Sequence, residues 1–104
     1  MEAAEIGNIG ERYVANWLTS KGYSGIQNTQ LPGSTDIEAH TSTTKILVQV
    51  KTAVVPYLPA GLSADERDAI VSRANRLGRQ AWLAQVQINS QRLLIGEIKW
   101  TKLN

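Results

Sequence analysis

The sequence predicts an α/β fold in which a mixed central sheet of about five strands is flanked by two helices. Three observations support this prediction: apolar residues at helical spacing near the start, short apolar runs in the middle, and a capped second helix followed by two more runs. The expected order is therefore helix, three strands, helix, two strands (α-β-β-β-α-β-β). Because the chain has 104 residues, 42% of them hydrophobic, we expect a single domain over residues 1–104 with one core.

The first expected element is a helix from Glu2 to Lys21. Its apolar or small residues recur at three- and four-residue steps, at Ile6, Gly10, Val14, Trp17 and Leu18. Gly22 provides a stop signal after it. Gly7 and Gly10 each cost about 1 kcal/mol against alanine inside a helix. Close packing of this helix on the sheet would explain both glycines.

Three strands are expected next. Tyr23–Thr29 is a weak strand, and a turn through Pro32–Ser34 leads to a second strand at Asp36–His40. A hairpin connection at Thr41–Thr44 joins it to the third strand, Lys45–Lys51. The apolar run in this third strand shows no polar alternation, which predicts a central strand covered on both faces.

The second half begins with a proline-bearing loop, Thr52–Leu62, followed by a helix. Ser63 and Glu66 have the spacing of a capping box, and Gly78 ends the helix after about Leu77. The last two strands, joined by residues 89–91, are expected at Trp82–Ile88 and Leu93–Trp100. The three tryptophans lie on apolar patterns and are assigned to the core: Trp17, Trp82 and Trp100.

Composition excludes several classes of protein. The chain has no cysteine, which excludes disulfides and thiolate zinc sites. No stretch approaches the roughly 18 apolar residues of a membrane helix, and the acidic amino terminus lacks the pattern of a signal peptide. We therefore expect a cytoplasmic, intracellular protein of prokaryotic or phage-like type with no membrane partner. The net charge of +2, from 11 basic and 9 acidic residues, is too small by itself to indicate nucleic acid.

Four polar residues on neighbouring strands indicate a site. Asp36 and Glu38 are two residues apart, so they share one face of their strand. Gln49 and Lys51 have the same spacing at the end of the next strand, after an apolar run. Carboxylates, an amide oxygen and an ammonium group side by side suit metal-assisted phosphodiester cleavage. Magnesium prefers oxygen ligands of this kind.

Each of these residues also has a purely structural alternative. Asp36 could cap its own turn, Gln49 could be a buried amide bonded to backbone, and Lys51 could reach solvent from the strand end. Glu38 could substitute as a ligand or lie at the rim. The combination of all four favours a site over four separate structural roles.

Glu11 is a further candidate, on the first helix. At 100° per residue it lies within about 20° of Leu18, so its carboxylate is expected at the edge of the apolar stripe, facing the sheet. It could complete a metal site or orient a water, or it could form an ion pair with Arg12 or Lys51. The single histidine, His40, is assigned to the strand surface.

Three segments together resemble the PD-(D/E)XK phosphodiesterase superfamily, which has the restriction-endonuclease-like fold. They are Gly7–Glu11, Asp36–Ala39 and Val48–Thr52. The sequence is most similar to the branch with archaeal-type Holliday junction resolvases and small restriction-like nucleases. It departs from the family pattern at Gln49, where an acid is usual, although some modified-DNA restriction enzymes share a Gln-x-Lys motif. Thr35 also replaces the usual proline.

The resemblance implies a Mg²⁺- or Mn²⁺-dependent DNA endonuclease, with junction resolvase-like structure specificity as one form of that activity. The implied catalytic residues are Asp36, Gln49, Lys51 and Glu11. The implied metal ligands are Asp36, Gln49, Val50, Glu11 and Glu38. The neutral Gln49 keeps an alternative open: a weak or inactive nuclease-fold module that binds DNA or a protein partner.

DNA contacts and self-association are expected elsewhere. Arg73, Arg76 and Arg79 recur every three residues and could track phosphates, although cations also suit a solvated helix end. Tyr57, in the proline-bearing loop, could stack on a base or hold the loop down. Because a 104-residue nuclease covers only part of a duplex, we expect a twofold homodimer, with the loop Ala53–Leu58 and the last strand at the interface.

Overall fold

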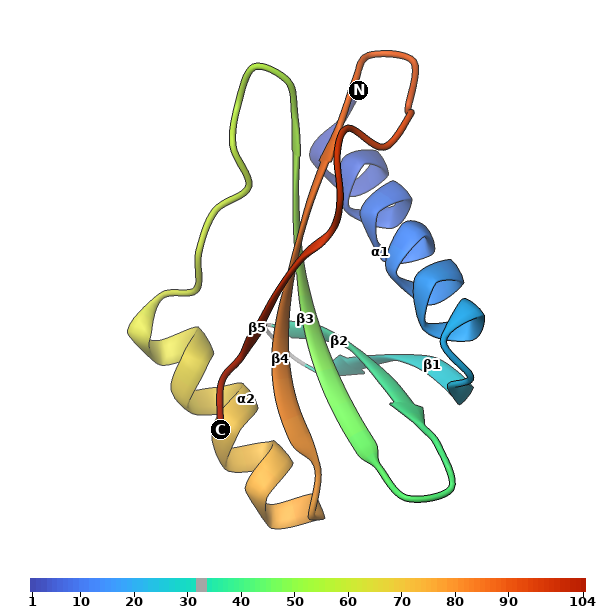
Figure 1. Cartoon of the computed structure of the whole chain (residues 1–104). Helices are drawn as coiled ribbons and strands as arrows, with labels where there is room; N and C mark the ends of the chain where they lie inside the picture. Colours follow the sequence, from blue (N-terminus) through green and yellow to red (C-terminus); the bar gives the residue numbers. More distant parts are fainter. Residues whose placement is uncertain (32–33) are drawn as a thin grey trace.

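The computed structural model describes residues 1–31 and 34–104, and it describes side chains outside positions 29–36. Pro32 and Gly33 of the predicted turn Pro32–Ser34 lie outside these residues, and Ser34 is already the first residue of β2. Two helices and five strands follow in the predicted order α-β-β-β-α-β-β (Figure 1). Their bounds are α1 Ala3–Ser20, β1 Ser24–Leu31, β2 Ser34–His40, β3 Lys45–Val54, α2 Ala64–Leu77, β4 Gln80–Ile88 and β5 Lys99–Lys102.

The strands form one mixed sheet in the spatial order β1-β2-β3-β4-β5. Only β3 and β4 are parallel, because α2 carries the chain back between them. The other neighbouring strands pair antiparallel. The predicted fold class is therefore confirmed. Among the described residues, no helix has the length and apolar character needed to cross a membrane.

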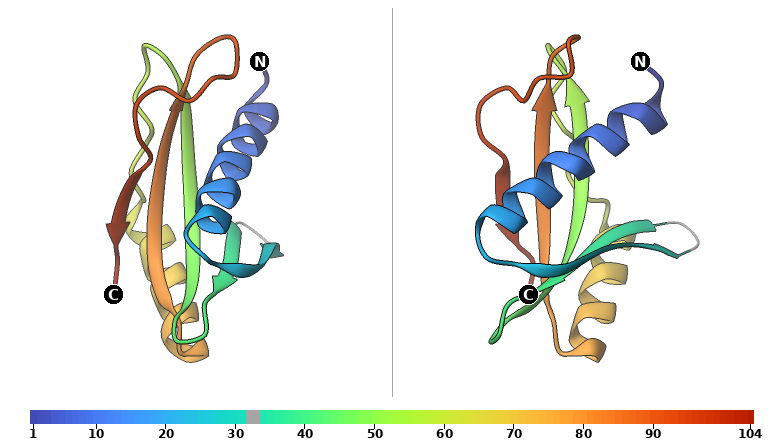
Figure 2. Two further views of the ribbon diagram at one scale, coloured as in Figure 1. Left: turned by 45° about the vertical axis from the view of Figure 1, so that its right-hand side comes forward. Right: turned by 90° about the vertical axis from the view of Figure 1, so that its right-hand side faces the viewer.

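The two helices cover opposite faces of the sheet (Figure 2). Apolar residues of α1, including Val14 and Leu18, pack with Ile46 and Val48 of β3. On the other face, α2 packs against a smaller cluster that contains Leu47, the residue between them. Successive residues of a strand point to opposite faces, so β3 contributes to both clusters. The expectation of a central strand covered on both faces is confirmed.

The start and end of α2 follow the sequence signals. The Ser63 hydroxyl accepts a hydrogen bond from the Glu66 amide at 3.1 Å, and Glu66 Oε1 accepts one from the Ser63 amide at 3.0 Å. These reciprocal bonds form the predicted capping box. Gly78 ends the helix in the left-handed conformation, with φ of 67°.

The predicted strand Leu93–Trp100 is wrong in its bounds. Only Lys99–Lys102 pairs with β4, and the residues before it form a loop with a single bridge between Ile88 and Leu94. The Asn89 side chain accepts hydrogen bonds from two following amides and turns the chain away from β4. The apolar residues of this segment therefore misled the prediction.

The other four strands are longer than expected: β1 is Ser24–Leu31 instead of Tyr23–Thr29, β2 begins at Ser34 instead of Asp36, and β3 and β4 each extend at one end. β3 continues to Val54 instead of ending at Lys51, because it stays paired with β4 as far as Ile88. For the same reason β4 begins at Gln80, which pairs with Ile46. The parallel pairing therefore carries the sheet past the polar end of the apolar run.

The glycines of α1 have different reasons. A Cβ atom at Gly10 would overlap the side chain of Thr52 in β3, so the helix and the sheet approach each other most closely there. At Gly7 an added Cβ would have no atom within 4 Å. Close packing on the sheet is therefore confirmed for Gly10 and wrong for Gly7.

The three tryptophans gather on the α1 face, but they are only partly buried. Trp17 and Trp100 have ring centroids 4.7 Å apart, and Trp82 meets Trp100 edge to face at 6.2 Å. They pack against the core cluster beneath α1. The predicted core position is met only in part, because each ring stays partly exposed.

We predict opposite effects for alanine at the two glycines of α1. Gly10→Ala should destabilise the fold by about 1–3 kcal/mol, because the new methyl group overpacks against Thr52. Gly7→Ala should stabilise it by about 0.4–1 kcal/mol, because alanine favours the helix and meets nothing. Urea unfolding of both variants measures the difference. A tolerated Gly10→Ala would contradict the close approach of α1 to β3.

Candidate active site

The predicted site residues of β3 lie where this strand changes from buried to partly exposed. Residues 46–49 of β3 are buried, and those after them are partly exposed. Gln49, with 8% of its surface exposed, is the last buried residue of this run. Its backbone pairs directly with Asp36 of β2, and Glu38 pairs with Leu47 one step along. The strand register therefore sets Asp36 opposite Gln49, at the polar end of the buried run, whereas Glu38 lies opposite the buried Leu47, away from Lys51.

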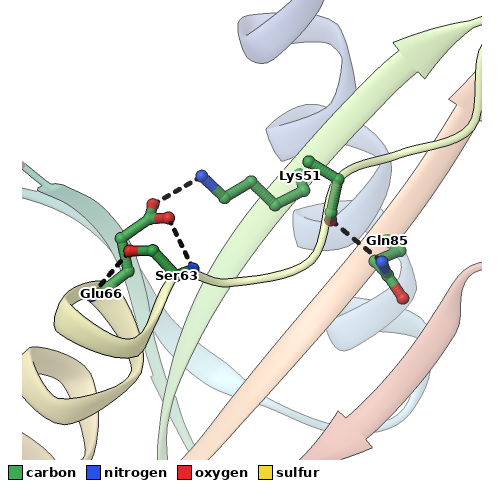
Figure 3. A network of polar contacts seen from close by, with 5 residues as sticks. Lys51, Ser63, Glu66 and Gln85 are labelled. Atoms are coloured by element: carbon green, nitrogen blue, oxygen red, sulfur yellow. Dashed lines mark hydrogen bonds and ion pairs between the residues drawn. The ribbon is translucent and has the colours of Figure 1, made fainter.

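Lys51 is tied to the start of α2. Its Nζ donates to Glu66 Oε2 at 2.6 Å, and both side chains are only partly exposed (26% for Lys51 and 35% for Glu66) (Figure 3). The other Glu66 oxygen accepts the hydrogen bond from the Ser63 amide. The hydrogen bond from Lys51, followed by that from the Ser63 amide, lowers the pKa of Glu66 below its usual value. Neither the predicted ion pair with Glu11 nor a free, solvent-reaching lysine is observed.

The loop between β3 and α2 is fastened to β4 by two amides. Gln85 donates to the carbonyl of Ala60 at 3.0 Å (Figure 3), and Gln87 donates to the carbonyl of Tyr57 at 2.8 Å. Gln85 also pairs with Lys51 in the parallel register. These bonds bring the chain back across the end of β3, so that Glu66 arrives beside Lys51.

Glu11 approaches from α1, on the other side of the sheet. Its carboxylate is half-buried and accepts a 3.5 Å hydrogen bond from the Asn28 side chain of β1. Asn28 pairs with Ile37, the residue after Asp36. Glu11 therefore contacts the sheet one residue along β2 from the Asp36–Gln49 pair. Burial raises the pKa of Glu11 above its usual value. Its predicted orientation toward the sheet is confirmed.

The described structure brings only part of the predicted site together. Gln49, Lys51 and the unpredicted Glu66 share the α2 face, while Glu11 lies near β2 on the α1 face. The side chain of Asp36 lies outside the described part of the structure. Among the described residues, no three acidic or histidine side chains form a group able to hold a metal ion.

The remaining candidate ligands are more limited. Glu38 is half-buried on β2. The side chain of Val50 packs on the α1 cluster, so this residue can offer a metal only its backbone carbonyl. His40 is exposed and its ring packs against Gly25 at the far end of β2, which fits the predicted surface position.

The candidate DNA-binding residues are spread over two regions. Arg76 is exposed on α2, whereas Arg73 is half-buried, and burial followed by the nearby Arg76 charge lowers its pKa. Arg79 lies beyond the end of α2 and donates to the carbonyl of Ile46 at 3.3 Å. Tyr57 is 75% exposed in the loop after β3.

Glu66 is the residue that sequence reasoning assigned only to a helix cap. Its capping-box spacing with Ser63 was visible, and both bonds of the box form. Nothing in the spacing showed that the start of α2 would lie beside Lys51, fifteen residues earlier. That contact depends on the path of the intervening loop.

Comparison with known proteins supports the fold. No protein-family model matches the chain, and no curated protein matches its sequence. Among solved structures it is similar to Hjc, a Holliday junction resolvase from the archaeal hyperthermophile Archaeoglobus fulgidus. The TM-score is 0.69 and the sequence identity 22%, and the match covers 93% of this chain and 72% of that chain. The chain therefore has the restriction-endonuclease-like fold of Hjc.

We predict that Glu11→Gln stabilises the protein at neutral pH. Because burial raises the pKa of Glu11 above the usual 4.5, ionising it costs folding free energy. That cost is absent below pH 4.5 and appears as the pH rises through the raised pKa of the folded state. Thermal unfolding should therefore show a higher midpoint for the variant at pH 7 and equal midpoints at pH 4.

The exposed acid Glu97 provides the control, because Glu97→Gln should leave the midpoint unchanged at both pH values. Equal midpoints for wild type and Glu11→Gln at pH 7 would show that the Glu11 carboxylate is well solvated.

Proposed function

We propose that this protein is a metal-dependent DNA endonuclease. The observation that carries the proposal is the pairing of Asp36 with Gln49 beside the half-buried Lys51, where the buried stretch of β3 ends. A polar group at the end of a buried strand must be satisfied or used. In the fold shared with Hjc, this cluster of acid, amide and ammonium suits the chemistry of phosphodiester hydrolysis.

The donor atoms suit a hard divalent cation. Asp36 and Glu38 offer carboxylate oxygens and Gln49 an amide oxygen, the kind of ligand that Mg²⁺ or Mn²⁺ prefers, and Val50 adds a backbone carbonyl. Glu11 is the remaining candidate carboxylate, but it lies on the α1 face of the sheet, against Asn28 of β1, opposite the face of Gln49 and Lys51. When bound, such a cation polarises the phosphate and makes a bound water more acidic. Gln49 contributes no charge, so the proposed site has one anionic ligand fewer than the superfamily motif that the sequence resembles.

In the proposed reaction, the Lys51 ammonium group interacts with the phosphate that is cleaved. Its ammonium lies at the partly exposed end of β3, where it can hold the attacking water or the charge that develops on phosphate oxygens. The pair with Glu66 keeps that ammonium on the α2 face, the face of Gln49. Lys51 therefore acts on the substrate side of the proposed site.

The proposed substrate is DNA, with branched junctions as the first form to test. The structural neighbour Hjc is a Holliday junction resolvase, and this chain shares its fold. Arg76 and Tyr57 are exposed and available to phosphates and bases, while Arg73 and Arg79 are held closer to the protein.

We predict that cleavage requires Asp36 and Lys51. Asp36→Asn and Lys51→Met should each lower the cleavage rate of duplex or four-way junction DNA with Mn²⁺ by at least about 100-fold, the usual loss when a charge-stabilising group is removed. Gel assays of labelled DNA measure the rate. Lys45→Met and Asp65→Asn are matched controls, because both residues are exposed and neither belongs to the proposed site.

Equal cleavage rates for the wild type and both site variants would contradict the proposal.

The neutral Gln49 favours one second candidate, a nuclease-fold module that binds DNA without cutting it. Calorimetry with Mn²⁺ separates the two: the module should show no heat of metal binding but a salt-sensitive affinity for DNA. Gln49→Glu should then introduce measurable Mn²⁺ binding.

We also propose that the protein acts as a twofold homodimer, which would present two sites to a symmetric DNA target. Large apolar side chains are exposed in the two loops at one end of the sheet, namely Val55, Tyr57, Leu58, Leu93 and Ile95. The Tyr57 carbonyl and the Ile95 amide both bond to Gln87, so these loops flank the same strand. The predicted interface includes the first of these loops.

Leu58, 80% exposed, tests the dimer. Light scattering at micromolar concentration should give twice the chain mass for wild type and a single chain mass for Leu58→Asp, because a buried charge opposes association. A monomeric wild type would contradict the homodimer.

A further inference from the structure

We propose that Glu66 is a positioning residue for Lys51, so that the cap of α2 sets the orientation of the proposed catalytic ammonium. This inference rests on the proposed endonuclease function. It extends that function to a residue on a second element, which has no place in the Asp–Gln–Lys cluster of β2 and β3.

The Glu66 carboxylate is held at both oxygens. Oε1 accepts from the Ser63 amide at 3.0 Å, and Oε2 accepts from Lys51 Nζ at 2.6 Å (Figure 3). The Ser63 hydroxyl in turn holds the Glu66 amide at 3.1 Å. A carboxylate used only as a cap would need just the first of these bonds. The short, charge-assisted bond to Lys51 is therefore an additional role.

The backbone around Glu66 is fixed from the same side. Gln85, the β4 partner of Lys51 in the sheet register, donates to the Ala60 carbonyl at 3.0 Å and contacts the Pro59 carbonyl at 3.4 Å. The loop therefore starts α2 at a set distance from β3. Lys51 and Glu66 are therefore connected in two ways: by their own ion pair, and through Gln85, which neighbours Lys51 in the sheet and holds the loop that leads to Glu66.

The consequence concerns the freedom of a long side chain. A lysine at the end of a strand has many rotamers, and ordering them costs free energy. An ion pair with a doubly held carboxylate limits the Lys51 ammonium to the α2 face before any substrate arrives. When a catalytic group is already held in place, the entropic cost of ordering it does not add to the activation free energy.

The test compares the chemical reactivity of Lys51 with catalysis. Glu66→Gln should raise the rate at which an amine-acylating reagent modifies Lys51, read by peptide mass spectrometry, by about two- to fivefold, the range that a partly exposed ion pair supports. With Mn²⁺ and DNA, the same variant should lower kcat about tenfold, as changes in supporting residues do, and leave KM unchanged.

Two further variants keep the test decisive. Asp65→Asn removes an acid from the same first turn of α2 and should change neither reactivity nor kcat. Glu66→Asp keeps the charge at the helix start but is too short to hold both partners, so it should behave like Glu66→Gln. It serves as the test variant if the glutamine form does not fold.

An unchanged acylation rate of Lys51 in both Glu66 variants would overturn the positioning role. Loss of Mn²⁺ binding in calorimetry of Glu66→Gln would also overturn it, because Glu66 would then be a metal ligand. If the wild type does not cut DNA, the endonuclease proposal fails by itself, and the acylation comparison still decides whether Glu66 holds Lys51.

Discussion

The dependence of β3 on cover from both helices organises the rest of the structure. Its residues 46–49 contribute alternately to the α1 and α2 clusters, so this stretch can carry only side chains that tolerate full burial. After Gln49 the side chains of β3 are only partly buried, so charged groups can be solvated there. Lys51 is the first charged side chain past that point. The candidate site therefore lies where the buried stretch of β3 ends.

The close approach of α1 at Gly10 and Thr52 fixes the other side of the site. Because a side chain at Gly10 has no room, the helix axis is held against β3 there, and the next residue, Glu11, is left beside the β1–β2 hairpin. Burial raises the pKa of Glu11, so ionising a carboxylate in this place costs folding free energy.

Lys51 and Glu66 connect the site to a part of the fold whose role had looked purely structural. The capping box stabilises the start of α2, and one of its members also neutralises the lysine. Gln85 and Gln87 hold the intervening loop on β4, so stability of the loop and geometry of the site are coupled. Changes in that loop are therefore expected to act on Lys51 even though they lie outside the site.

Much of this protein follows from local patterns in its sequence. The period of the apolar residues and the capping and glycine signals determined both helices, the order of elements and the double-sided cover of β3. The segment Leu93–Trp100 failed because an apolar run says nothing about whether a partner strand is in reach. The acids, Gln49 and Lys51 were identified from spacing of two along strands. Only tertiary structure paired Lys51 with Glu66 and set Glu11 beside Asn28, because those contacts depend on loop paths and helix docking between distant segments.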